Sequence, residues 1–352
     1  MLGEKKSAGK GRFAPSPTGD FHIGNLRTAL LAWAFARHDG RTFHMRIEDL
    51  DERSRPEYVT RQLEDLTKIG VTWDGPELFQ SKRLERYEEV FSGLASQDWL
   101  YECFCTRKEL ANVVSAPHQP PGSYPGTCRN LTADEREQRR ARFNGTNRGA
   151  AYRLKTRENS GSVHDRQCGA YQGAIDDLVV RRGDGIFSYN FVSVVDDGDY
   201  GVDQIVRGDD LLPSTPRQVY LQHVLGYQTP EYAHVPLVLN TAGARLAKRD
   251  GAVTLRQLGE CGWDVSDIVE LLAGSLGIRH DLTDREGDPL VDRVADQVAD
   301  PLVDQPGIIP RSGIRSADEF LKHFDPDLLP RTPWHLDVEK LEKGPAAYYN
   351  ER

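Results

Sequence analysis

Strand-like and helix-like periods of hydrophobic residues alternate at the start of this chain. Residues 11–14, Gly-Arg-Phe-Ala, predict a short buried strand, after which two prolines and a glycine break the chain. From residue 22 onward, apolar residues recur at spacings of three and four, the period of one helix face: Leu26, Ala29, Leu30 and Trp33. Gly40 follows as the expected C-terminal stop. The pattern therefore predicts a buried strand, a turn and a helix.

The alternation continues to about residue 100. Residues 42–47 predict a second strand, and helical patterns follow over residues 56–69 and 82–95. We therefore expect residues 1–100 to form the first half of an α/β fold, in which helices pack against a sheet.

A second α/β segment lies further along the chain. Residues 204–207 and 234–239 predict buried strands. A helix is expected between them, with Thr215 as N-cap and Pro216 at the first helical position. Residues 240–243 read Asn-Thr-Ala-Gly and predict a turn after the second of these strands.

The middle of the chain has a different texture. From residue 101 to residue 189 the periodicity weakens, prolines cluster and cysteines gather. We therefore expect an insertion between the two α/β halves. Residues 178–182 and 186–190, joined by Gly-Asp-Gly, predict a hairpin that leads out of this insertion.

The C-terminal part contains little regular pattern. Residues 265–276 predict one helix, and residues 316–324 a short capped helix. Between them, residues 281–315 are acidic and of low complexity, and the motif DPLVD occurs twice, at 288–292 and at 300–304. This composition predicts a disordered insertion or linker.

Composition limits the class of protein. At 352 residues, the chain can hold two or three domains with a buried core. It has no apolar run long enough to cross a membrane and no hydrophobic signal region in residues 1–10, so we expect a cytoplasmic protein with no membrane partner. Five cysteines, an odd number, argue against a disulfide framework. A net charge of −9 argues against indiscriminate binding to nucleic acid.

The first candidate site lies where the first helix begins. Residues 22–25 read HIGN, which places His22 and Asn25 at the helix start. Free backbone N–H groups and the positive end of the helix dipole favour phosphate there. An imidazole and an amide can also donate hydrogen bonds to charge that grows on an α-phosphate. A surface turn is the alternative, but the whole run RFAPSPTGDFHIGN between a strand and a helix favours a nucleotide site.

A second basic run, RLAKRDG at residues 245–251, follows the predicted turn. Lys248 can act as a mobile point charge on the β- and γ-phosphates and follow a leaving pyrophosphate. A solvated basic loop would be the better interpretation of this run in isolation. Together, the two runs describe a site that holds a nucleoside triphosphate from two sides.

These motifs resemble those of the class I aminoacyl-tRNA synthetases. HIGN stands for the family's HIGH signature and RLAKR for its KMSKS signature, although Arg245 and Ala247 depart from the usual pattern. The resemblance narrows to the glutamyl branch, because four further runs match it in order and rough spacing. They are RFAPSPTG at 12–19, RIEDLD at 46–51, NFVSVVDD at 190–197 and RGDDLL at 207–212.

The resemblance covers about residues 11–277 and implies a fold. That fold is a class I synthetase Rossmann-type nucleotide-binding domain with an inserted zinc-containing subdomain and a short helical C-terminal region. Residues 1–100 and 190–240 would be the two halves of the catalytic domain. Residues 101–189 would be the inserted zinc-binding, acceptor subdomain, and residues 241–352 would hold the KMSKS-like loop and the C-terminal helices.

The resemblance also implies a glutamate pocket. A dicarboxylic amino acid needs two cationic partners and one anionic partner, and a guanidinium group suits a carboxylate. Arg12 and Arg207 resemble the two cations, with Arg207 for the second carboxylate, and Glu48 resembles the group that takes the α-ammonium. The set is completed by Ala14, Ser16 and Tyr189. Ser193 departs from the asparagine of ordinary glutamyl-tRNA synthetases.

For ATP, the resemblance implies contacts from four residues, with Mg²⁺ accompanying the substrate. These residues are His22, Gly24, Asn25 and Lys248. Three of them, His22, Asn25 and Lys248, would be the catalytic residues.

The insertion contains a candidate metal site. Residues 103–105 read Cys-Phe-Cys and residues 124–128 read Tyr-Pro-Gly-Thr-Cys. Three thiolates and a fourth ligand could bind zinc, but the spacing alone leaves ordinary buried cysteines equally open. The pattern resembles the structural zinc site of the glutamyl-queuosine tRNA(Asp) synthetases, which implies one Zn²⁺ on Cys103, Cys105, Tyr124 and Cys128. Cys168 and Cys261 are expected to pack as small apolar residues.

A basic segment follows these cysteines. It could contact a phosphate backbone, or it could be a solvated helix face that also carries glutamates, and both interpretations stay open. Its members are Arg136, Arg139, Arg140, Arg142, Arg148, Arg153, Lys155 and Arg157.

The resemblance to the glutamyl-queuosine tRNA(Asp) synthetases covers nearly the whole ordered length of the chain. The residues after Lys248 are expected to leave no room for an anticodon-binding domain of the usual size. The resemblance implies ATP-dependent, tRNA-independent activation of glutamate, and transfer of the glutamyl group to queuosine in the anticodon arm of tRNA(Asp). A monomer is expected. Two alternatives stay open: a truncated glutamyl-tRNA synthetase that charges tRNA(Glu), and a non-catalytic, synthetase-derived tRNA-binding protein.

Overall fold

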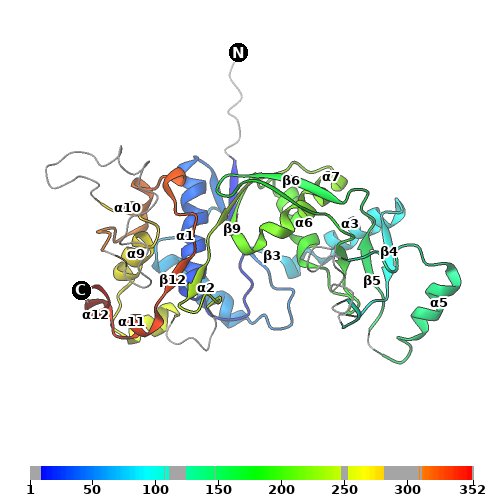
Figure 1. Cartoon of the computed structure of the whole chain (residues 1–352), viewed down its shortest axis with the longest axis horizontal. Helices are drawn as coiled ribbons and strands as arrows, with labels where there is room; N and C mark the ends of the chain where they lie inside the picture. Colours follow the sequence, from blue (N-terminus) through cyan, green and yellow to red (C-terminus); the bar gives the residue numbers. More distant parts are fainter. Residues whose placement is uncertain are drawn as a thin grey trace, which may run out of the picture.

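The computed structural model describes residues 9–106, 108–110, 124–146, 148–246, 253–280, 309 and 311–350. The molecule is elongated, with a large sheet through its middle and a smaller sheet in the lobe at the right of Figure 1. Helices cover the large sheet on both faces. The α/β class expected from the sequence is confirmed.

The strand order of the large sheet indicates where a ligand cleft should lie. It has seven strands in the hydrogen-bonded order β3 (Leu78–Phe79), β2 (Thr42–Ile47), β1 (Lys10–Phe13), β9 (Gln204–Gly208), β10 (Glu231–Val235), β6 (Ser160–Asp165) and β7 (Gly169–Ala174). Neighbouring strands are parallel, except for the antiparallel pair β6 and β7. The strand order reverses between β1 and β9. Ligands of open α/β sheets bind at such a reversal, beyond the carboxyl ends of the strands.

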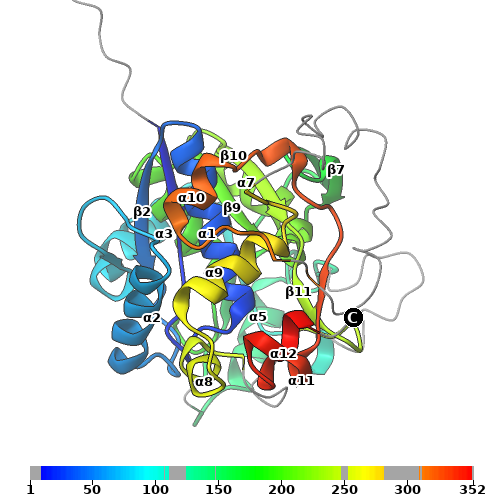
Figure 2. The same ribbon diagram turned by 90° about the vertical axis from the view of Figure 1, so that its left-hand side faces the viewer.

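Helix α1 (Ile23–His38) is sandwiched between the sheet and the C-terminal helices. It packs on β1 and β9, with α9 (Val265–Gly274) and α10 (Ala317–Lys322) on its outer side (Figures 1 and 2). Because it is covered on both sides, hydrophobic residues surround α1 instead of forming one stripe. Its buried residues form the centre of the main hydrophobic cluster.

The other face of the sheet carries a second hydrophobic cluster. Three helices form it: α3 (Leu84–Ser96), α6 (Tyr189–Asp199) and α7 (Thr215–Leu225). The smaller, antiparallel sheet extends from this cluster and consists of β4 (Leu100–Cys103), β5 (Ala151–Leu154) and β8 (Val179–Arg181). Helix α5 (Ala133–Ala141) lies at the outer end of this lobe (Figure 1).

The C-terminal segment belongs to the main body. Strand β12 (Trp334–Leu336) pairs in parallel with β11 (Val238–Asn240), the strand that leads toward residue 248. Leu336, Leu341 and Tyr348 lie in the same hydrophobic cluster as α1. The remaining elements are α2 (Pro56–Lys68), α8 (Leu255–Glu260), α11 (Val338–Glu342), α12 (Pro345–Asn350) and the short helices η1 (Gln80–Arg83), η2 (Asp209–Ser214) and η5 (Pro326–Leu328).

The hairpin expected over residues 178–190 is confirmed as far as Ser188, where its second arm ends early. The N–H of Arg182 donates to the carbonyl oxygen of Ile186 at 2.8 Å, and the N–H of Ser188 donates to that of Val180 at 2.9 Å. Strand β8 ends at Arg181, and Phe187 makes a single bridge back to Arg181. Ser188 then caps α6, because its Oγ accepts a hydrogen bond from the backbone N–H of Phe191 at 3.4 Å. A serine N-cap starts a helix where the apolar pattern had indicated a strand.

Two further expectations need correction. The N-cap of α7 is Ser214, not Thr215, which is the first helical residue. The strand expected over 234–239 is divided into β10 and β11 at Pro236, because proline has no N–H to donate to a sheet. The acidic repeats lie within residues 281–308, outside the described residues. No helix in the described parts of the chain is long and apolar enough to cross a membrane.

Candidate active site

A cleft of about 760 Å³ opens beyond the carboxyl ends of β1 and β9. Residues of both distant motifs line it, although the second motif is represented only by Arg245 and Leu246. From the glutamate set, the lining includes Arg12, Ala14, Ser16, Tyr189 and Arg207, and from the nucleotide set it includes His22, Gly24 and Asn25. Arg245 also lines the cleft and pairs with Asp210 at 2.9 Å. Lys248 lies outside the described residues.

His22 is the N-cap of α1, and its ring folds back onto the helix. Its Nδ1 accepts hydrogen bonds from the backbone N–H groups of Gly24 and Asn25, at 3.1 and 3.3 Å. A nitrogen that accepts carries no proton, so the proton of the neutral ring is on Nε2. Burial lowers the pKa of His22, which favours this neutral form. His22 therefore offers an N–H donor to the cleft.

The helix start differs from the expectation of free backbone N–H groups. The N–H of Ile23 donates to the carbonyl oxygen of Val253 at 2.8 Å, and the N–H of His22 donates to Oδ1 of Asn25 at 3.1 Å. With Gly24 and Asn25 bound to His22, the protein itself uses these donors. A phosphate would instead meet the Nε2–H of His22 and the side-chain amide N–H of Asn25.

Gly24 is required by the position of the His22 ring. A Cβ atom at Gly24 would lie 2.9 Å from Cε1 of His22 and 3.4 Å from Cβ of Val238. The first distance is shorter than carbon atoms tolerate, so any larger residue would displace the imidazole. The glycine thus leaves room for the His22 ring and for Val238 of β11 to pack against the first turn of α1.

Arg12 is held from behind by a carboxylate of α6. Its Nε and Nη2 donate to Asp197 at 3.2 and 3.4 Å, and both side chains are almost fully buried. Asp197 also accepts from Arg46 at 2.5 Å. Although burial raises it, these two arginines hold the pKa of Asp197 below its ordinary value. The guanidinium group of Arg12 is therefore fixed at the wall of the cleft.

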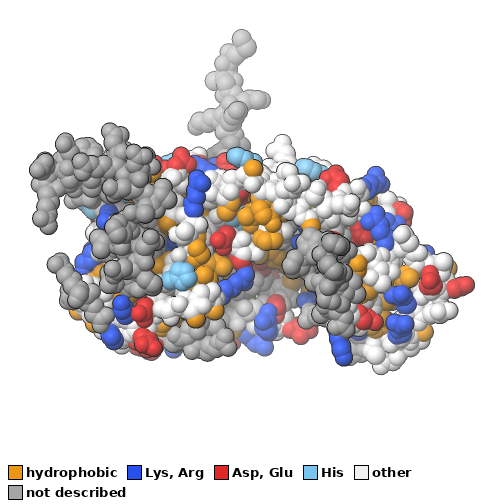
Figure 3. Space-filling view, viewed as in Figure 1, with side chains coloured by type: hydrophobic (Ala, Val, Ile, Leu, Met, Phe, Trp, Pro, Cys, Tyr) orange, Lys and Arg blue, Asp and Glu red, His pale blue; other side chains and the backbone are white. Residues whose placement is uncertain are grey.

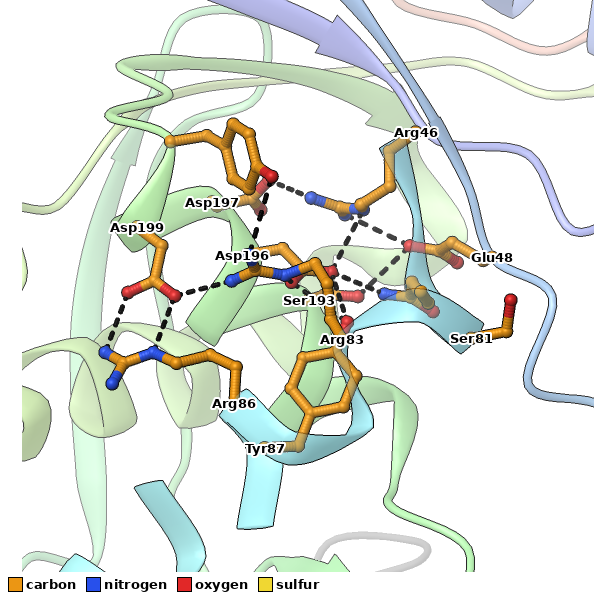
Figure 4. A network of polar contacts seen from close by, with 12 residues as sticks. Arg46, Glu48, Ser81, Arg83, Arg86, Tyr87, Ser193, Asp196, Asp197 and Asp199 are labelled. Carbon is orange, nitrogen blue, oxygen red and sulfur yellow. Dashed lines mark hydrogen bonds and ion pairs between the residues drawn. The ribbon is translucent and has the colours of Figure 1, made fainter. Parts of the chain in front are cut away.

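Glu48 stands behind the cleft wall and does not line it. Its Oε1 accepts from Nη2 of Arg46 at 3.0 Å and from Oγ of Ser193 at 3.2 Å (Figure 4). Burial raises the pKa of Glu48 more than the neighbouring arginines lower it. Ser193, the residue that departs from the glutamyl pattern, thus contacts the carboxylate assigned to the α-ammonium group.

The rest of this network anchors α6. Asp196 accepts from Nε of Arg83 at 2.7 Å and from the hydroxyl of Tyr87 at 2.9 Å. Asp199 accepts from Nε of Arg86 at 2.9 Å (Figure 4). Three acidic groups of α6 therefore bind arginines from four other elements, β1, β2, η1 and α3. These contacts fix the helix that presents Asp197 and Ser193.

The predicted metal ligands lie together. The Sγ atoms of Cys103, Cys105 and Cys128 are all within 4.8 Å of one another. The hydroxyl of Tyr124 lies 3.4 Å from Sγ of Cys103 and 3.9 Å from Sγ of Cys105. Four ligands of a tetrahedral zinc ion are about 3.8 Å apart when the Zn–S bonds are about 2.3 Å long. The donor set and its spacing therefore fit one metal ion.

The basic segment does not form one surface. Arg153 is buried, stacks 3.7 Å above the Tyr124 ring and donates to the carbonyl oxygen of Asp177. Arg140 pairs with Glu102 and Glu137, and Lys155 with Asp98. The right-hand lobe in Figure 3, which carries α5, shows acidic and basic side chains intermixed. The solvated-face interpretation suits α5, whose residues are all at least partly exposed.

The two remaining cysteines differ from each other. Cys261 is partly buried and packs against the main hydrophobic cluster, as expected. Cys168 is exposed, so the expectation that it packs as an apolar residue is wrong. It follows Asp165, whose carboxylate accepts the backbone N–H of Cys168 and turns the chain between β6 and β7.

Comparisons with known proteins identify relatives of the chain. A family model described as tRNA synthetases class I (E and Q), catalytic domain, matches residues 10–277. The Glutamyl-Q tRNA(Asp) synthetase of Nocardia farcinica is 49% identical over 328 residues, which are 93% of each chain. Glutamate–tRNA ligase 1 of Caldanaerobacter subterraneus is 38% identical, and the match spans 74% of this chain but 55% of that protein.

Among solved structures, the chain is similar to a glutamate tRNA ligase from Elizabethkingia meningosepticum in complex with its amino acid. The TM-score is 0.65 at 26% identity, and the match covers 95% of this chain and 68% of that chain.

Proposed function

The chain belongs to the class I tRNA synthetases of the glutamyl and glutaminyl group, and from that premise we propose that it joins glutamate to queuosine in tRNA(Asp). The observation that carries this proposal is the extent of the match. The relative named Glutamyl-Q tRNA(Asp) synthetase matches over 93% of both chains, whereas the chain spans 55% of the glutamate–tRNA ligase. The chain is therefore built on the plan of the queuosine-modifying enzymes.

The first step activates glutamate. An oxygen of its α-carboxylate attacks the α-phosphorus of ATP, and the bond to the β-phosphate oxygen breaks to release pyrophosphate. His22 and Asn25 donate N–H groups to the α-phosphate, where charge grows during the attack. Lys248 supplies the cation for the departing phosphates. Mg²⁺ carried by ATP offsets further phosphate charge.

Glutamate is held by groups of both signs. Arg12, fixed by Asp197, binds one carboxylate, and Arg207 on the other strand binds the second. Ala14, Ser16 and Tyr189 shape the same wall. Glu48 lies behind this wall, bound to Arg46 and Ser193, so its negative charge would attract the α-ammonium group from outside the lining. Positioning and electrostatic stabilisation account for the catalysis, because the protein itself forms no covalent bond.

The second step transfers the glutamyl group. A hydroxyl oxygen of the queuosine base attacks the glutamyl carbonyl carbon, and the bond to the adenylate oxygen breaks to release AMP. The hydroxyl proton leaves with the phosphate or solvent. The partner is thus the anticodon arm of tRNA(Asp), and not a 3′ end.

We propose that Cys103, Cys105, Tyr124 and Cys128 hold one Zn²⁺. The ion would cross-link residues 103–105 to residues 124–128. It would take no part in the reaction, because four protein ligands complete its tetrahedral shell and leave no position for a substrate.

The test is glutamate-dependent exchange of pyrophosphate into ATP without RNA, followed by transfer of labelled glutamate. We expect exchange without RNA, and label on tRNA(Asp) that contains queuosine but not on tRNA(Asp) that lacks it. After nuclease cleavage, the label should lie in the anticodon fragment. Exchange that requires tRNA(Glu) would instead indicate a shortened glutamyl-tRNA synthetase, and silence with every tRNA would indicate a binding protein.

A further inference from the structure

Arg207 has one anchored edge and one open edge. It stands at the carboxyl end of β9 with 5% of its surface exposed, and it lines the cleft. Its Nε donates to Nε2 of His234 at 3.0 Å, and its Nη2 donates to Oγ1 of Thr215 at 2.8 Å. Both donors belong to the same edge of the guanidinium group. Nη1 makes no hydrogen bond within the described residues, so the other edge is available to a ligand.

His234 can accept this bond because Asp165 fixes its tautomer. Its Nδ1 lies 2.6 Å from Oδ2 of Asp165, and both side chains are fully buried. Asp165 also accepts the backbone N–H groups of Gln167, Cys168 and His234. A carboxylate with these donors is ionised and can only accept. The imidazole proton is therefore on Nδ1, and the lone pair of Nε2 can accept from Nε of Arg207. Oγ1 of Thr215, the other anchor of Arg207, lies 3.1 Å from the same nitrogen.

The charges around His234 keep the ring neutral. Burial lowers its pKa, and the positive charge of Arg207 lowers it further, against the effect of Asp165. Although burial raises it, the bond from His234 and the backbone N–H groups hold the pKa of Asp165 below its ordinary value. The other groups that face the imidazole are Asp209 and the stacked ring of Tyr232, 5.9 Å away. A chain of hydrogen bonds therefore runs from the guanidinium group of Arg207 through the neutral imidazole of His234 to the carboxylate of Asp165.

The two arginines of the cleft are held in different ways. Arg12 is bound by the carboxylate of Asp197, so its charge is largely compensated within the protein. Arg207 is bound by an imidazole nitrogen and a hydroxyl oxygen, both neutral, while the carboxylate of Asp165 stands one residue further away. A neutral acceptor orients a guanidinium group without compensating its charge. Arg207 can therefore use its charge on a carboxylate in the cleft.

We propose that His234, held by Asp165, is a positioning residue that aims Arg207 at the side-chain carboxylate of glutamate and thereby sets the preference for glutamate over glutamine. This inference rests on the proposed function, because it takes glutamate as the substrate. Glutamine has the same shape but carries no charge at that end, so its binding gains little from an uncompensated guanidinium group.

The test is a pair of substitutions that separate the two nitrogens of the ring. His234→Asn keeps an N–H near Nδ1 for Asp165 but provides no acceptor for Arg207. His234→Gln places an amide oxygen near Nε2. We expect His234→Asn to raise the KM for glutamate roughly tenfold and to lower the glutamate-to-glutamine ratio of kcat/KM by a similar factor, with the KM for ATP unchanged. His234→Gln should recover much of both losses.

Tyr232→Phe is the matched control. It keeps the ring that stacks on His234 and lies beneath the Arg207 guanidinium group, and it removes only the hydroxyl, which accepts a hydrogen bond from Gln222. A purely structural disturbance would lower the active fraction in all three variants and leave the KM for glutamate and the substrate ratio unchanged. That result, or equal losses in the Asn and Gln variants, would overturn the inference.

Two further measurements keep the outcomes distinct. If the histidine variants do not fold, Thr215→Val removes the second anchor of Arg207 with nearly the same shape. It should shift the KM for glutamate and the substrate ratio in the same direction by a smaller factor, and an unchanged ratio would count against the inference. Absence of glutamate-dependent exchange in the unmodified protein would instead contradict the proposed function.

Discussion

At the scale of single residues, His22 has two separable roles. Its Nδ1 caps α1 by accepting two backbone N–H groups, which leaves the proton on Nε2 as the donor that this cleft-lining residue can offer. We expect the cap to contribute to stability and the Nε2–H to contribute to catalysis in the proposed reaction. A substitution that replaces one role without the other can therefore separate them.

We predict that His22→Ala lowers both properties and His22→Asn lowers one. The alanine variant should lose about 1 kcal/mol of unfolding free energy with the cap. Its kcat for pyrophosphate exchange should fall by roughly 10²–10³. Asparagine is a good N-cap residue, so His22→Asn should recover stability but not activity. Urea titration and exchange kinetics check the two effects, and an asparagine variant with full activity would contradict a role for Nε2–H.

Asp65 gives a prediction about pH. Burial, with the nearby Asp20 and Glu64, raises its pKa to about 6, against the effect of Lys68. Because this pKa is higher in the folded than in the unfolded chain, the ionised carboxylate lowers stability above pH 6. We expect Asp65→Asn to raise the free energy of unfolding at pH 8 by about 1 kcal/mol. The gain should shrink as the pH falls through 6 and vanish near pH 4.

The control for Asp65 is Glu64→Gln on the same helix. Glu64 is exposed, so this variant should change the unfolding free energy by only a few tenths of a kcal/mol at about pH 8. A gain for Asp65→Asn that stays the same from pH 8 to pH 4 would show that charge is not its cause.

At the scale of elements, the spacing of apolar residues together with turn and cap residues was sufficient for several helices and strands. Strand β2 and helices α1, α2 and α9 lie at or within two residues of their predicted bounds. The hairpin of β6 and β7 was missed, because its residues are small, polar and largely exposed, so they have no apolar alternation. The beginning of α6 depended on one capping serine, which a hydrophobic pattern does not register.

The partners of site residues could not be predicted from spacing. Arg12 and Asp197 are 185 residues apart, and Arg207 and His234 are on different strands. The sequence contained the right residue types within recognisable motifs, which located the cleft. Which carboxylate holds which arginine depends on the order of strands in the sheet, and only the fold establishes that order.

The loop after β4 gives a prediction about metal. Cys128 contributes one of three thiolates that lie within 4.8 Å of one another. Purified protein should contain about one zinc per chain, and Cys128→Ser should lose most of it and melt at a lower temperature. Cys261→Ser is the matched control, because Cys261 packs in the main cluster, apart from this site. Equal zinc content in the two variants would contradict the proposed ligand set.

At the scale of the whole molecule, the C-terminal segment is part of the catalytic body and not an appendage. Strand β12 pairs in parallel with β11, and Nε1 of Trp263 donates to the carbonyl oxygen of Leu341 at 2.8 Å. Arg27, buried in α1, donates to the carbonyl oxygen of Pro236 at 2.7 Å and to Oγ of Ser275 at 3.1 Å. These contacts connect α1, whose first turn lines the cleft, with β11 and with the C-terminal region.

This continuity predicts that the chain cannot be shortened at residue 308. Removal of residues 309–352 would take away four side chains that are each at most 1% exposed: Phe320, Leu336, Leu341 and Tyr348. The part of the hydrophobic cluster that they cover would then be exposed to water. Each such side chain contributes roughly 1.5–3 kcal/mol, so the loss would reach or exceed the stability of an ordinary domain. The shortened protein should therefore lose its cooperative melting transition and bind a hydrophobic dye.

Leu336→Ala serves as the graded control for the truncation. It leaves one cavity in the same cluster, so the protein should stay folded while its unfolding free energy falls by about 2–5 kcal/mol. If the C-terminal segment were an independent module, the shortened chain would melt at the temperature of the full protein and the alanine variant would leave that transition unchanged. Both measurements report on how the C-terminal segment packs against the main body. Helix α10 of this segment covers α1, and its strand β12 pairs with β11. Its loss should therefore disturb both sides of the nucleotide site.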